Sequence, residues 1–351
     1  MTSIAQVPVI SPMREHRAGR DRRATRRRLV TVALALVVVA LFSTTLMVGR
    51  SFYDPVQVLS VIFGADVPGA SFAVGQLRLP RATLGVLAGI CYGMGGITFQ
   101  TMLRNPLAAP DIIGITSGAS AAGVIGIVVL SWSHAQTSML AVVAALAVAL
   151  LVYLLSSKGG VVGARLILIG IGIAAILDSV VAYVIVRASQ WDLQTAMRWL
   201  SGSLNGTTWT SVLPVALAVA VLSPLLLVNA RPLSLLQHGD DTARALGVSV
   251  GRTRALVVLA AVALIAFATA ASGPIAFVAF LAGPIAARLC GVGGSLLLPA
   301  ALVGAALVLG ADLCGQWAFG ARYPVGVVTG VLGAPYLVFL LIRTNRSGGS
   351  L

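Results

Sequence analysis

The polar stretch from Asn229 to Arg254, NARPLSLLQHGDDTARALGVSVGRTR, interrupts a second half of the chain that is otherwise apolar nearly everywhere. It carries the end signals of two very short helices. The side chain of Asp240 or Asp241 is expected to accept hydrogen bonds from the free N–H groups of the turn that follows. Gly247 is expected to end that turn in the left-handed conformation, and Ser249 to cap a second one. Such a segment suits a contact surface, and a plain connecting loop is the alternative that spacing leaves open.

The composition excludes an ordinary soluble protein. Hydrophobic residues make up 58% of the chain and charged residues 10%, whereas about a quarter of an average globular chain is charged. The net charge of +14 would suggest nucleic acid in a soluble protein, but no basic stripe is interleaved with aromatic residues that stack on bases. We therefore expect an all-α protein that spans a membrane and binds no nucleic acid.

Apolar runs define the expected spans. A spanning helix needs about 20 residues, and ten runs approach or reach that length, at 29–48, 82–102, 112–131, 138–156, 163–187, 211–229, 255–272, 275–290, 296–316 and 325–343. Residues 1–28 form a basic N-terminal tail, and residues 29–345 a single transmembrane domain that includes the polar segment 231–254. The proline-containing stretch from Arg50 to Arg81 is expected to be an external loop.

Arginine placement predicts the orientation, because cytoplasmic loops carry an excess of Lys and Arg. With the N-terminus inside, the inner side holds eight N-terminal arginines together with Arg104, Lys158, Arg165, Arg231, Arg244, Arg252, Arg254, Arg288, Arg343 and Arg346. The outer side holds only Arg50, Arg78, Arg81, Arg187, Arg198 and Arg322. Both termini and the segment 231–254 are therefore expected in the cytoplasm.

Catalytic and metal-binding motifs are missing from the sequence. Lys158, in SSKGG, lacks the upstream glycine and the following hydroxyl of a phosphate loop. The three cysteines have no Cys or His at ligand spacing and are expected to be small buried hydrophobic residues. A transporter without its own ATPase site must draw energy from an ion gradient or from another subunit. For a gradient-driven transporter the candidate acids are Asp178 and Asp312, although a structural hydrogen bond is the favoured role of each.

Glycines recur every four residues in two of the expected spans. They are Gly85, Gly89 and Gly93 in one span, and Gly114 and Gly118 in the next. Small residues at this spacing let helix backbones approach closely in lipid. The pattern predicts a compact bundle.

The run QLRLPRATLGVLAGICYGMGGITFQTMLRNPLAAPDIIGITSGAS, which begins at Gln76, resembles the signature of the FecCD-type family of permeases in iron-siderophore, haem and cobalamin ABC importers. The resemblance extends in order through almost the whole chain from residue 30 to 345, and its signature positions include Gln100, Asn105, Pro106, Gly114, Asp312, Pro324, Gly326 and Pro335. It implies a type II ABC importer permease of about ten spans that pairs with a second copy or a related permease. The family's other partners are a pair of ATPase subunits, which use the ATP, and a periplasmic or lipid-anchored binding protein.

The resemblance also implies roles for residues. The coupling segment that meets the ATPase is similar at Gly239, Asp240, Asp241, Thr242, Ala243, Arg244, Leu246 and Gly247. Arg78 and Arg81 are similar to the arginines that receive acidic residues of the binding protein, with interface anchoring as the alternative. We expect reversal of both charges to abolish uptake. The translocation path is expected along Gly170, Gly172 and Ala175, with iron travelling inside its chelator and no cofactor or metal bound by this chain.

The sequence departs from the family pattern at several positions. In the run Gly283 to Arg288 the usual histidine and one arginine are missing, and Gln316 stands where an arginine often follows the ninth span, with Arg322 the nearest substitute. Ala276 and Ala279, where glycines are common, resemble enterobactin-type permeases. The expected function is import of a ferric siderophore across the inner membrane. Import of cobalamin or haem, and a gradient-driven transporter, are the alternatives.

Overall fold

The computed structural model describes residues 12–157, 163–291 and 293–346, and within these ranges the regular structure is entirely helical. Residues 1–11 of the basic tail, and Lys158, lie outside the described residues. The α-helices are α1 (Pro12–Met47), α2 (Pro55–Ile62), α3 (Ala70–Phe72), α4 (Leu79–Leu103), α5 (Ile115–Val124), α6 (His134–Ser157), α7 (Gly163–Val186), α8 (Gln190–Leu200), α9 (Trp209–Val228), α10 (Ala230–Leu235), α11 (Asp240–Ala245), α12 (Val250–Ser272), α13 (Val278–Cys290), α14 (Leu297–Trp317) and α15 (Val325–Arg346).

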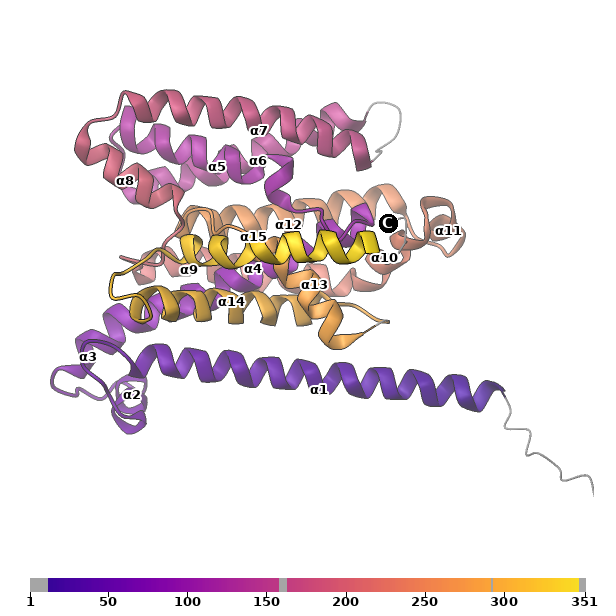
Figure 1. Cartoon of the computed structure of the whole chain (residues 1–351), viewed down its shortest axis with the longest axis horizontal. Coiled ribbons are helices and arrows are strands. Elements are labelled where there is room, and N and C mark those ends of the chain that lie inside the picture. The colour runs from indigo at the N-terminus through magenta and orange to yellow at the C-terminus, as the bar shows by residue number, and fades with distance from the viewer. Residues whose placement is uncertain (1–11, 158–162, 292, 347–351) are drawn as a thin grey trace, which may run out of the picture.

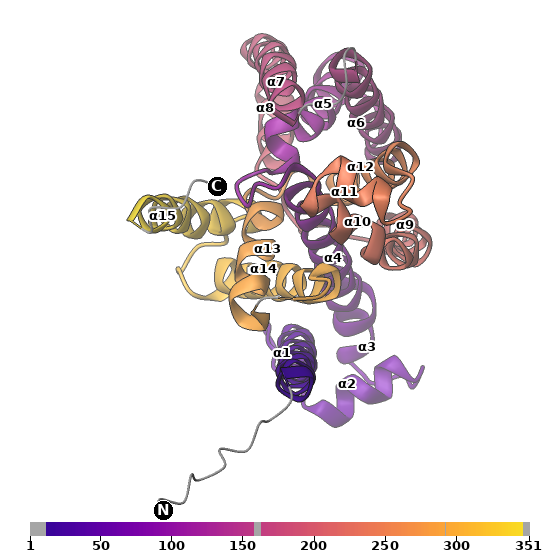
Figure 2. The ribbon, with the colours of Figure 1, turned by 90° about the vertical axis from the view of Figure 1, so that its right-hand side faces the viewer.

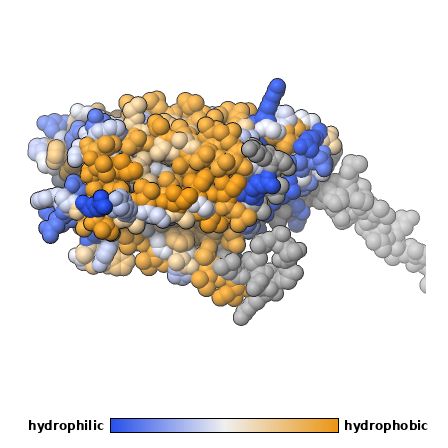
Figure 3. All heavy atoms as spheres, turned by 90° about the horizontal axis from the view of Figure 1, so that it is seen from above, coloured by the Kyte–Doolittle hydropathy of each residue, from blue (hydrophilic) through white to orange (hydrophobic). Residues whose placement is uncertain are grey.

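The long helices run side by side, as a membrane bundle requires (Figure 1). Among the described residues, 7 helices are long and apolar enough to cross a membrane, and shorter apolar helices cover Ile115–Val129, Val278–Cys290 and Val325–Phe339. Together these match the predicted ten crossings. Seen from above, hydrophobic side chains cover the middle of the molecule and hydrophilic ones gather at its two ends (Figure 3). The prediction of a polytopic all-α transmembrane bundle is confirmed.

Two faces close the bundle at its ends. The end that carries α10, α11 and the C-terminal end of α15 is called here the terminal face, and the end that carries α2, α3 and α8 is called the opposite face (Figure 1). The crossing helices alternate in direction between the two faces. This alternation assigns each connecting loop to one of the two faces.

The external loop predicted for residues 50–81 is wrong in its second half. Helix resumes at Ala70, and the second crossing runs from Ala70 to Leu103 without a break. Pro80 does not stop it, because a π-helical turn over Ala73–Arg78 directly precedes this proline. The wider turn gives room where an ordinary α-helix would place a carbonyl group against the proline ring.

Helix α4 lies at the centre of the bundle and packs against α12, α13 and α14 (Figure 2). A Cβ atom at Gly89 would lie 2.4 Å from the Cα atom of Ala305, and one at Gly93 would lie 2.2 Å from the carbonyl oxygen of Ala300. Real Cβ atoms cannot approach so closely, so only glycine lets α4 and α14 pack at this distance. The predicted role of the glycine stripe in helix packing is confirmed.

Several signature residues join helices. The side-chain amide of Gln100 on α4 donates to the carbonyl oxygen of Phe280 on α13. Asn105 accepts the backbone N–H of Leu107, which shapes the turn that also contains Pro106. Gly114 has φ +81° at the start of α5, and a Cβ there would meet the backbone of α7.

The last two signature positions lie on α15. Gly326 donates its backbone N–H to the carbonyl oxygen of Gly202, and a Cβ at Gly326 would lie 2.1 Å from the carbonyl oxygen of Ser201. Pro324 accepts the first backbone bonds of α15, and Pro335 lies inside this helix. These residues fix the beginning of α15 against the loop that follows α8.

Candidate functional site

The segment 229–254 forms a helical projection on the terminal face (Figure 1). Its two short helices are α10 and α11, and Val250 already begins the long helix α12, so the predicted second short helix is wrong. The predicted cap is wrong too. Gly239, with φ +108°, occupies the N-cap of α11 and no side chain caps that end, while Gly247 has the expected positive φ of +83°. Ser249 is the N-cap residue of α12 but makes no side-chain capping bond.

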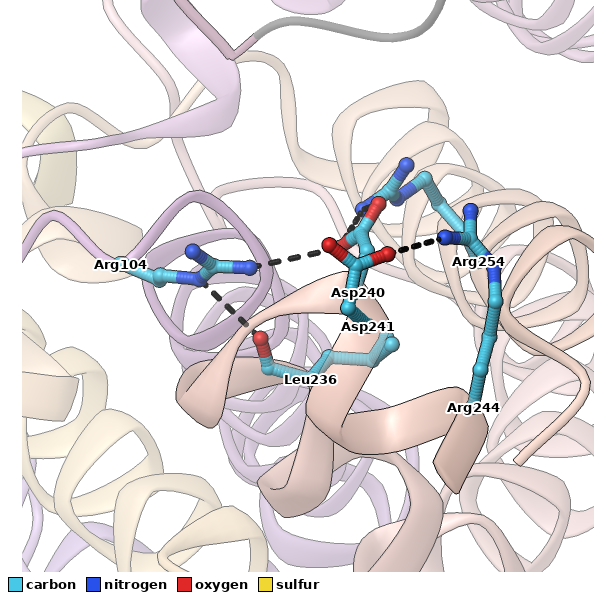
Figure 4. Close-up of polar contacts among 6 residues, drawn as sticks. All are labelled: Arg104, Leu236, Asp240, Asp241, Arg244 and Arg254. Carbon is cyan, nitrogen blue, oxygen red and sulfur yellow. Dashed lines mark hydrogen bonds and ion pairs between the residues drawn. The ribbon is translucent and has the colours of Figure 1, made fainter. Parts of the chain in front are cut away.

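Asp240 joins the projection to the bundle instead of capping α11. Its Oδ1 and Oδ2 atoms accept hydrogen bonds from Arg254 Nη2 of α12 at 2.9 and 3.1 Å. Oδ1 also accepts one from Arg104 Nη2, at the end of α4, at 3.3 Å (Figure 4). The Asp240 carboxylate therefore binds two core helices at once, and all three hydrogen bonds are charge-assisted.

Arg104 holds a second point of the projection. It has a left-handed backbone, with φ +53°, and its Nε donates to the carbonyl oxygen of Leu236 at 3.0 Å (Figure 4). Leu236 is fully buried in the short turn between α10 and α11. We refer to Asp240, Arg104, Arg254 and the Leu236 carbonyl as the Asp240 clasp.

Asp241 makes a much weaker contact than its neighbour. Its side chain is 99% exposed, and among the described residues it pairs only with Arg244, one turn along the same short helix. The Asp240 side chain is 31% exposed, and its partner Arg254 is 13% exposed. Two adjacent aspartates thus have different surroundings, although sequence alone gave them the same role.

The other predicted coupling residues divide into buried and exposed positions. Ala243 is fully buried against the bundle, whereas Thr242, Arg244 and Leu246 are exposed. Leu246, the C-cap residue of α11, presents an apolar side chain that is 59% exposed. The projection has a fixed inner side and an outer side free to meet a partner.

A second candidate site is a basic cavity on the opposite face. This cavity, of about 530 Å³, is lined by four arginines, Arg50, Arg78, Arg81 and Arg322, and by no acidic residue. The sequence prediction contained two of them. We refer to it as the arginine cavity.

Arg78 and Arg81 are only partly available in this cavity, because both bind other parts of the chain. Arg78 donates to the carbonyl oxygens of Leu46, Met47 and Ser51 and so caps the end of α1. Its guanidinium also lies 4.8 Å from the centroid of the Tyr53 ring. The contacts of Arg78 hold α1 against α4, while Arg50 and Arg322 are exposed.

Arg81 forms a buried ion pair with Asp312. Its Nε and Nη2 donate to the two carboxylate oxygens at 2.9 and 2.8 Å. Gln316 donates to the same carboxylate at 2.8 Å, and Asp312 is 2% exposed. Asp312 thus contacts the side chains of Arg81 and Gln316, and not a helix end as the sequence favoured, and Gln316 donates to this acid at the position where the family often has an arginine.

The residues predicted to line the path differ in their burial. Gly170 is buried on α7 near Gly114, which begins α5. Gly172 and Ala175 are exposed on another side of α7, and open space lies beside Gly172. Asp178 is also exposed on α7, and none of the described residues bonds to it. The structure therefore presents two of the three residues on an open helix surface.

The described residues contain no group of three or more His, Cys, Asp or Glu side chains that could hold a metal ion. Cys91 and Cys290 are buried, but Cys314 is exposed, which corrects the expectation that all three are buried.

Sequence reasoning missed Arg104, Arg254 and Arg50 as site residues, and it named Arg322 only as the nearest substitute for an arginine of the family. A signal existed for the first two, because the whole chain has only 10 acidic residues. An acid in the segment 231–254 therefore has more arginines than acids around it in the sequence. Which arginine it contacts depends on helix packing.

Comparison with known proteins gives a single family. The model of the FecCD transport family matches residues 35–343. The chain is 39% identical over 326 residues to the ferric enterobactin transport system permease protein FepG of Escherichia coli, covering 92% of this chain and 98% of that protein. It is 36% identical over 338 residues to the achromobactin transport system permease protein CbrC of Dickeya dadantii, covering 95% and 96%.

A solved structure has the same fold. A metal-chelate type ABC transporter in an inward-facing conformation superposes with a TM-score of 0.81 at 27% identity, covering 90% of this chain and 99% of that chain. The similarity extends along nearly the whole sequence, and the structure has the helix bundle, the glycine packing and the contacts of the signature residues. The chain therefore belongs to the FecCD transport family of membrane permeases.

Proposed function

We propose that this chain is the permease subunit of an ABC importer that carries ferric siderophores across the bacterial inner membrane. The observation that carries the proposal is the family match over residues 35–343, together with relatives named for ferric enterobactin and achromobactin transport. The absence of a phosphate loop from the sequence supports a separate ATPase subunit as the source of energy.

The terminal face is the cytoplasmic face in this proposal, with both chain ends inside. Support comes from arginine placement, since the described arginines of this face include Arg22, Arg23, Arg26, Arg27, Arg28, Arg104, Arg231, Arg244, Arg252 and Arg254. The opposite face carries fewer basic residues. This asymmetry is the one that sets orientation in bacterial membranes.

The projection is the docking point of the ATPase pair. Its exposed side, which includes Leu246, meets the ATPase, and its buried side passes displacement into the bundle through the Asp240 clasp. The clasp contacts both α4 and α12, the former at the centre of the bundle. A partner shifts a two-state equilibrium only by the difference between its affinities for the two states, so closure of the ATPase pair must change the contacts on this exposed side.

The arginine cavity receives acidic residues of a binding protein on the outer side. Asp312 neutralises Arg81, but no ion pair is recorded among the described residues for the other three arginines, which give a local positive potential that steers an acidic partner. Arg50 and Arg322 are better test positions than Arg78 and Arg81, because the latter pair also stabilises the chain. With Arg50 and Arg322 both changed to Glu, we expect normal amounts of protein in the membrane and strongly reduced uptake.

Helix α7 lines the path at the contact with a second permease subunit, either a copy of this chain or a related one. The exposed surface of Gly172 and Ala175 supports this, since such small residues leave room for a large chelate. A weakly binding wall suits transport, because a tight site would trap the cargo.

Uptake measurements test the proposal directly. Cells that lack this protein are supplied with radiolabelled iron bound to siderophores, with free labelled iron and with labelled cobalamin. Loss of siderophore-bound iron alone is the expected result, and it should be restored by the wild-type gene. Loss of cobalamin uptake with unchanged iron uptake would overturn the choice of cargo and keep the importer architecture.

A further inference from the structure

The basic end of α1 continues the first membrane crossing as a single helix. The helix has 36 residues, which at about 1.5 Å per residue gives a length of about 54 Å. The hydrocarbon core of a bilayer is only about 30 Å thick. The arginine-rich turns that precede Leu29 therefore lie at the level of the lipid headgroups and beyond, on the terminal face.

Two of these arginines hold α1 against α13. Arg26 donates from Nε to the carbonyl oxygen of Leu289 at 3.2 Å and from Nη2 to that of Arg288 at 3.4 Å. Arg27 donates from Nη1 to the carbonyl oxygen of Gly293 at 3.4 Å. Carbonyl groups at the end of a helix have no partner within it and carry partial negative charge, so these bonds cap α13 and the loop after it.

Three further arginines of the same turns are exposed and have no such partner. Arg22, Arg23 and Arg28 are exposed, and none of the ion pairs recorded among the described residues involves α1. The acid beside them, Asp21, is exposed as well. Positive charge thus remains uncompensated next to the helix that caps α13.

We propose that Arg22, Arg23 and Arg28 form a binding site for anionic phospholipid headgroups of the cytoplasmic leaflet. Guanidinium groups bind phosphate oxygens in a bidentate manner, and basic clusters directly cytoplasmic of a spanning helix attract anionic lipids. The position favours lipid over a protein partner, because α1 lies at the edge of the bundle, apart from α10 and α11 (Figure 2). The inference rests on the proposed orientation of the chain.

Lipid bound here acts next to the proposed coupling region. The loop capped by Arg27 contributes Gly293 and Gly294 to a cavity of about 710 Å³ on the terminal face. Leu233 and His238 of the projection line the same cavity. A headgroup that steadies α1 therefore steadies one wall of the space behind the projection.

The test measures lipid selectivity and does not depend on transport. The full chain is placed in nanodiscs of phosphatidylcholine containing a trace of fluorescent phosphatidylglycerol, and enrichment of the probe around the protein is measured at low and high salt. Wild-type protein should enrich the anionic probe, and salt should weaken the enrichment by screening. Changing Arg22, Arg23 and Arg28 to Gln should lower the relative affinity roughly a hundredfold, since each arginine near a membrane surface contributes about a factor of five.

A matched variant removes three exposed arginines elsewhere, with Arg187, Arg198 and Arg252 changed to Gln, and should keep the enrichment. Changing the three α1 arginines to Lys should keep it in large part, because the charge remains. If the triple Gln variant does not fold, the three single Gln variants replace it, each with an expected loss of about fivefold. Wild-type enrichment in the Gln variant would overturn the site. An equal loss in the matched variant would show that net charge, and not this site, attracts the lipid. If the Gln variant lost its association with the ATPase in lipid-free detergent, the surface would be a protein contact instead of a lipid site. A failed siderophore uptake assay with intact lipid selectivity would reject the proposed function alone.

Discussion

Changing Asp240 to Asn tests the Asp240 clasp without altering the rest of the projection. The substitution keeps the size of the side chain and one oxygen acceptor but removes the charge that binds Arg254 and Arg104. Asp241→Asn is the matched control, because this neighbouring residue is 99% exposed and pairs only within α11. Both variants change the charge of the protein by the same amount.

The contacts give the size of the expected effect. The bond to Arg254, whose side chain is 13% exposed, belongs to the charge-assisted class and contributes about 1.5 kcal/mol. The bond to Arg104, which is 46% exposed, contributes about 0.5 kcal/mol because solvent screens it. Their sum of about 2 kcal/mol corresponds to roughly a 30-fold change in the ratio of attached to detached projection. For Asp241→Asn we expect no measurable change.

The assay compares transport with ATP hydrolysis in proteoliposomes that contain the assembled importer. If the clasp transmits displacement, Asp240→Asn should bind the ATPase and permit hydrolysis, while uptake per ATP falls by up to roughly 30-fold, the factor derived above. Thermal unfolding of the purified chain should show only a modest loss of stability. Asp241→Asn should match the wild type in all three measurements.

Two results would refute this reasoning. Unchanged uptake per ATP in Asp240→Asn would show that displacement enters the bundle elsewhere. An equal loss in Asp241→Asn would show that charge on the projection, and not the clasp, governs coupling.

Three further predictions follow from packing, burial and exposure. Gly89→Leu should prevent folding, because even a Cβ there would lie 2.4 Å from Ala305, whereas Gly310→Leu on α14, with open space beside it, should be tolerated; thermal unfolding compares the two. Asp312→Asn should lower the free energy of unfolding by about 3 kcal/mol. This is the lower end of the range for a broken buried pair, because the Arg81 side chain is 16% exposed and stays partly solvated. Asp178→Asn, which changes an exposed acid on α7, should not lower the free energy of unfolding. Gly172→Trp should leave the amount of folded protein unchanged and reduce uptake, and normal uptake would argue against a path along this side of α7.

Much of the fold was readable from the sequence. Backbone groups in lipid must bond within their own helix, so an apolar run of spanning length has one stable form, and each run was found as a helix. The glycines of α4 were also readable, because a four-residue spacing marks one side of a helix whatever it packs against.

The errors lie where neighbouring structure overrides local signals. Asp240 has the sequence context of a cap, but two arginines from α4 and α12 bind its carboxylate more strongly than backbone N–H groups would. The prolines before Arg81 indicated a loop, and a π-helical turn instead lets the helix continue through the last of them, Pro80.

Composition, helix count and the glycine spacing were determined by the sequence alone, because solvation in lipid and helix geometry act over a few residues at a time. The side chains that form the two sites were decided only by tertiary structure. Arg81 and Asp312 are 231 positions apart and Arg104 and Asp240 are 136 apart, and their meeting depends on how closely the glycines let the helices pack. A charge that is buried in a low-dielectric bundle is stabilised by an opposite charge, and the fold selects which one lies within reach.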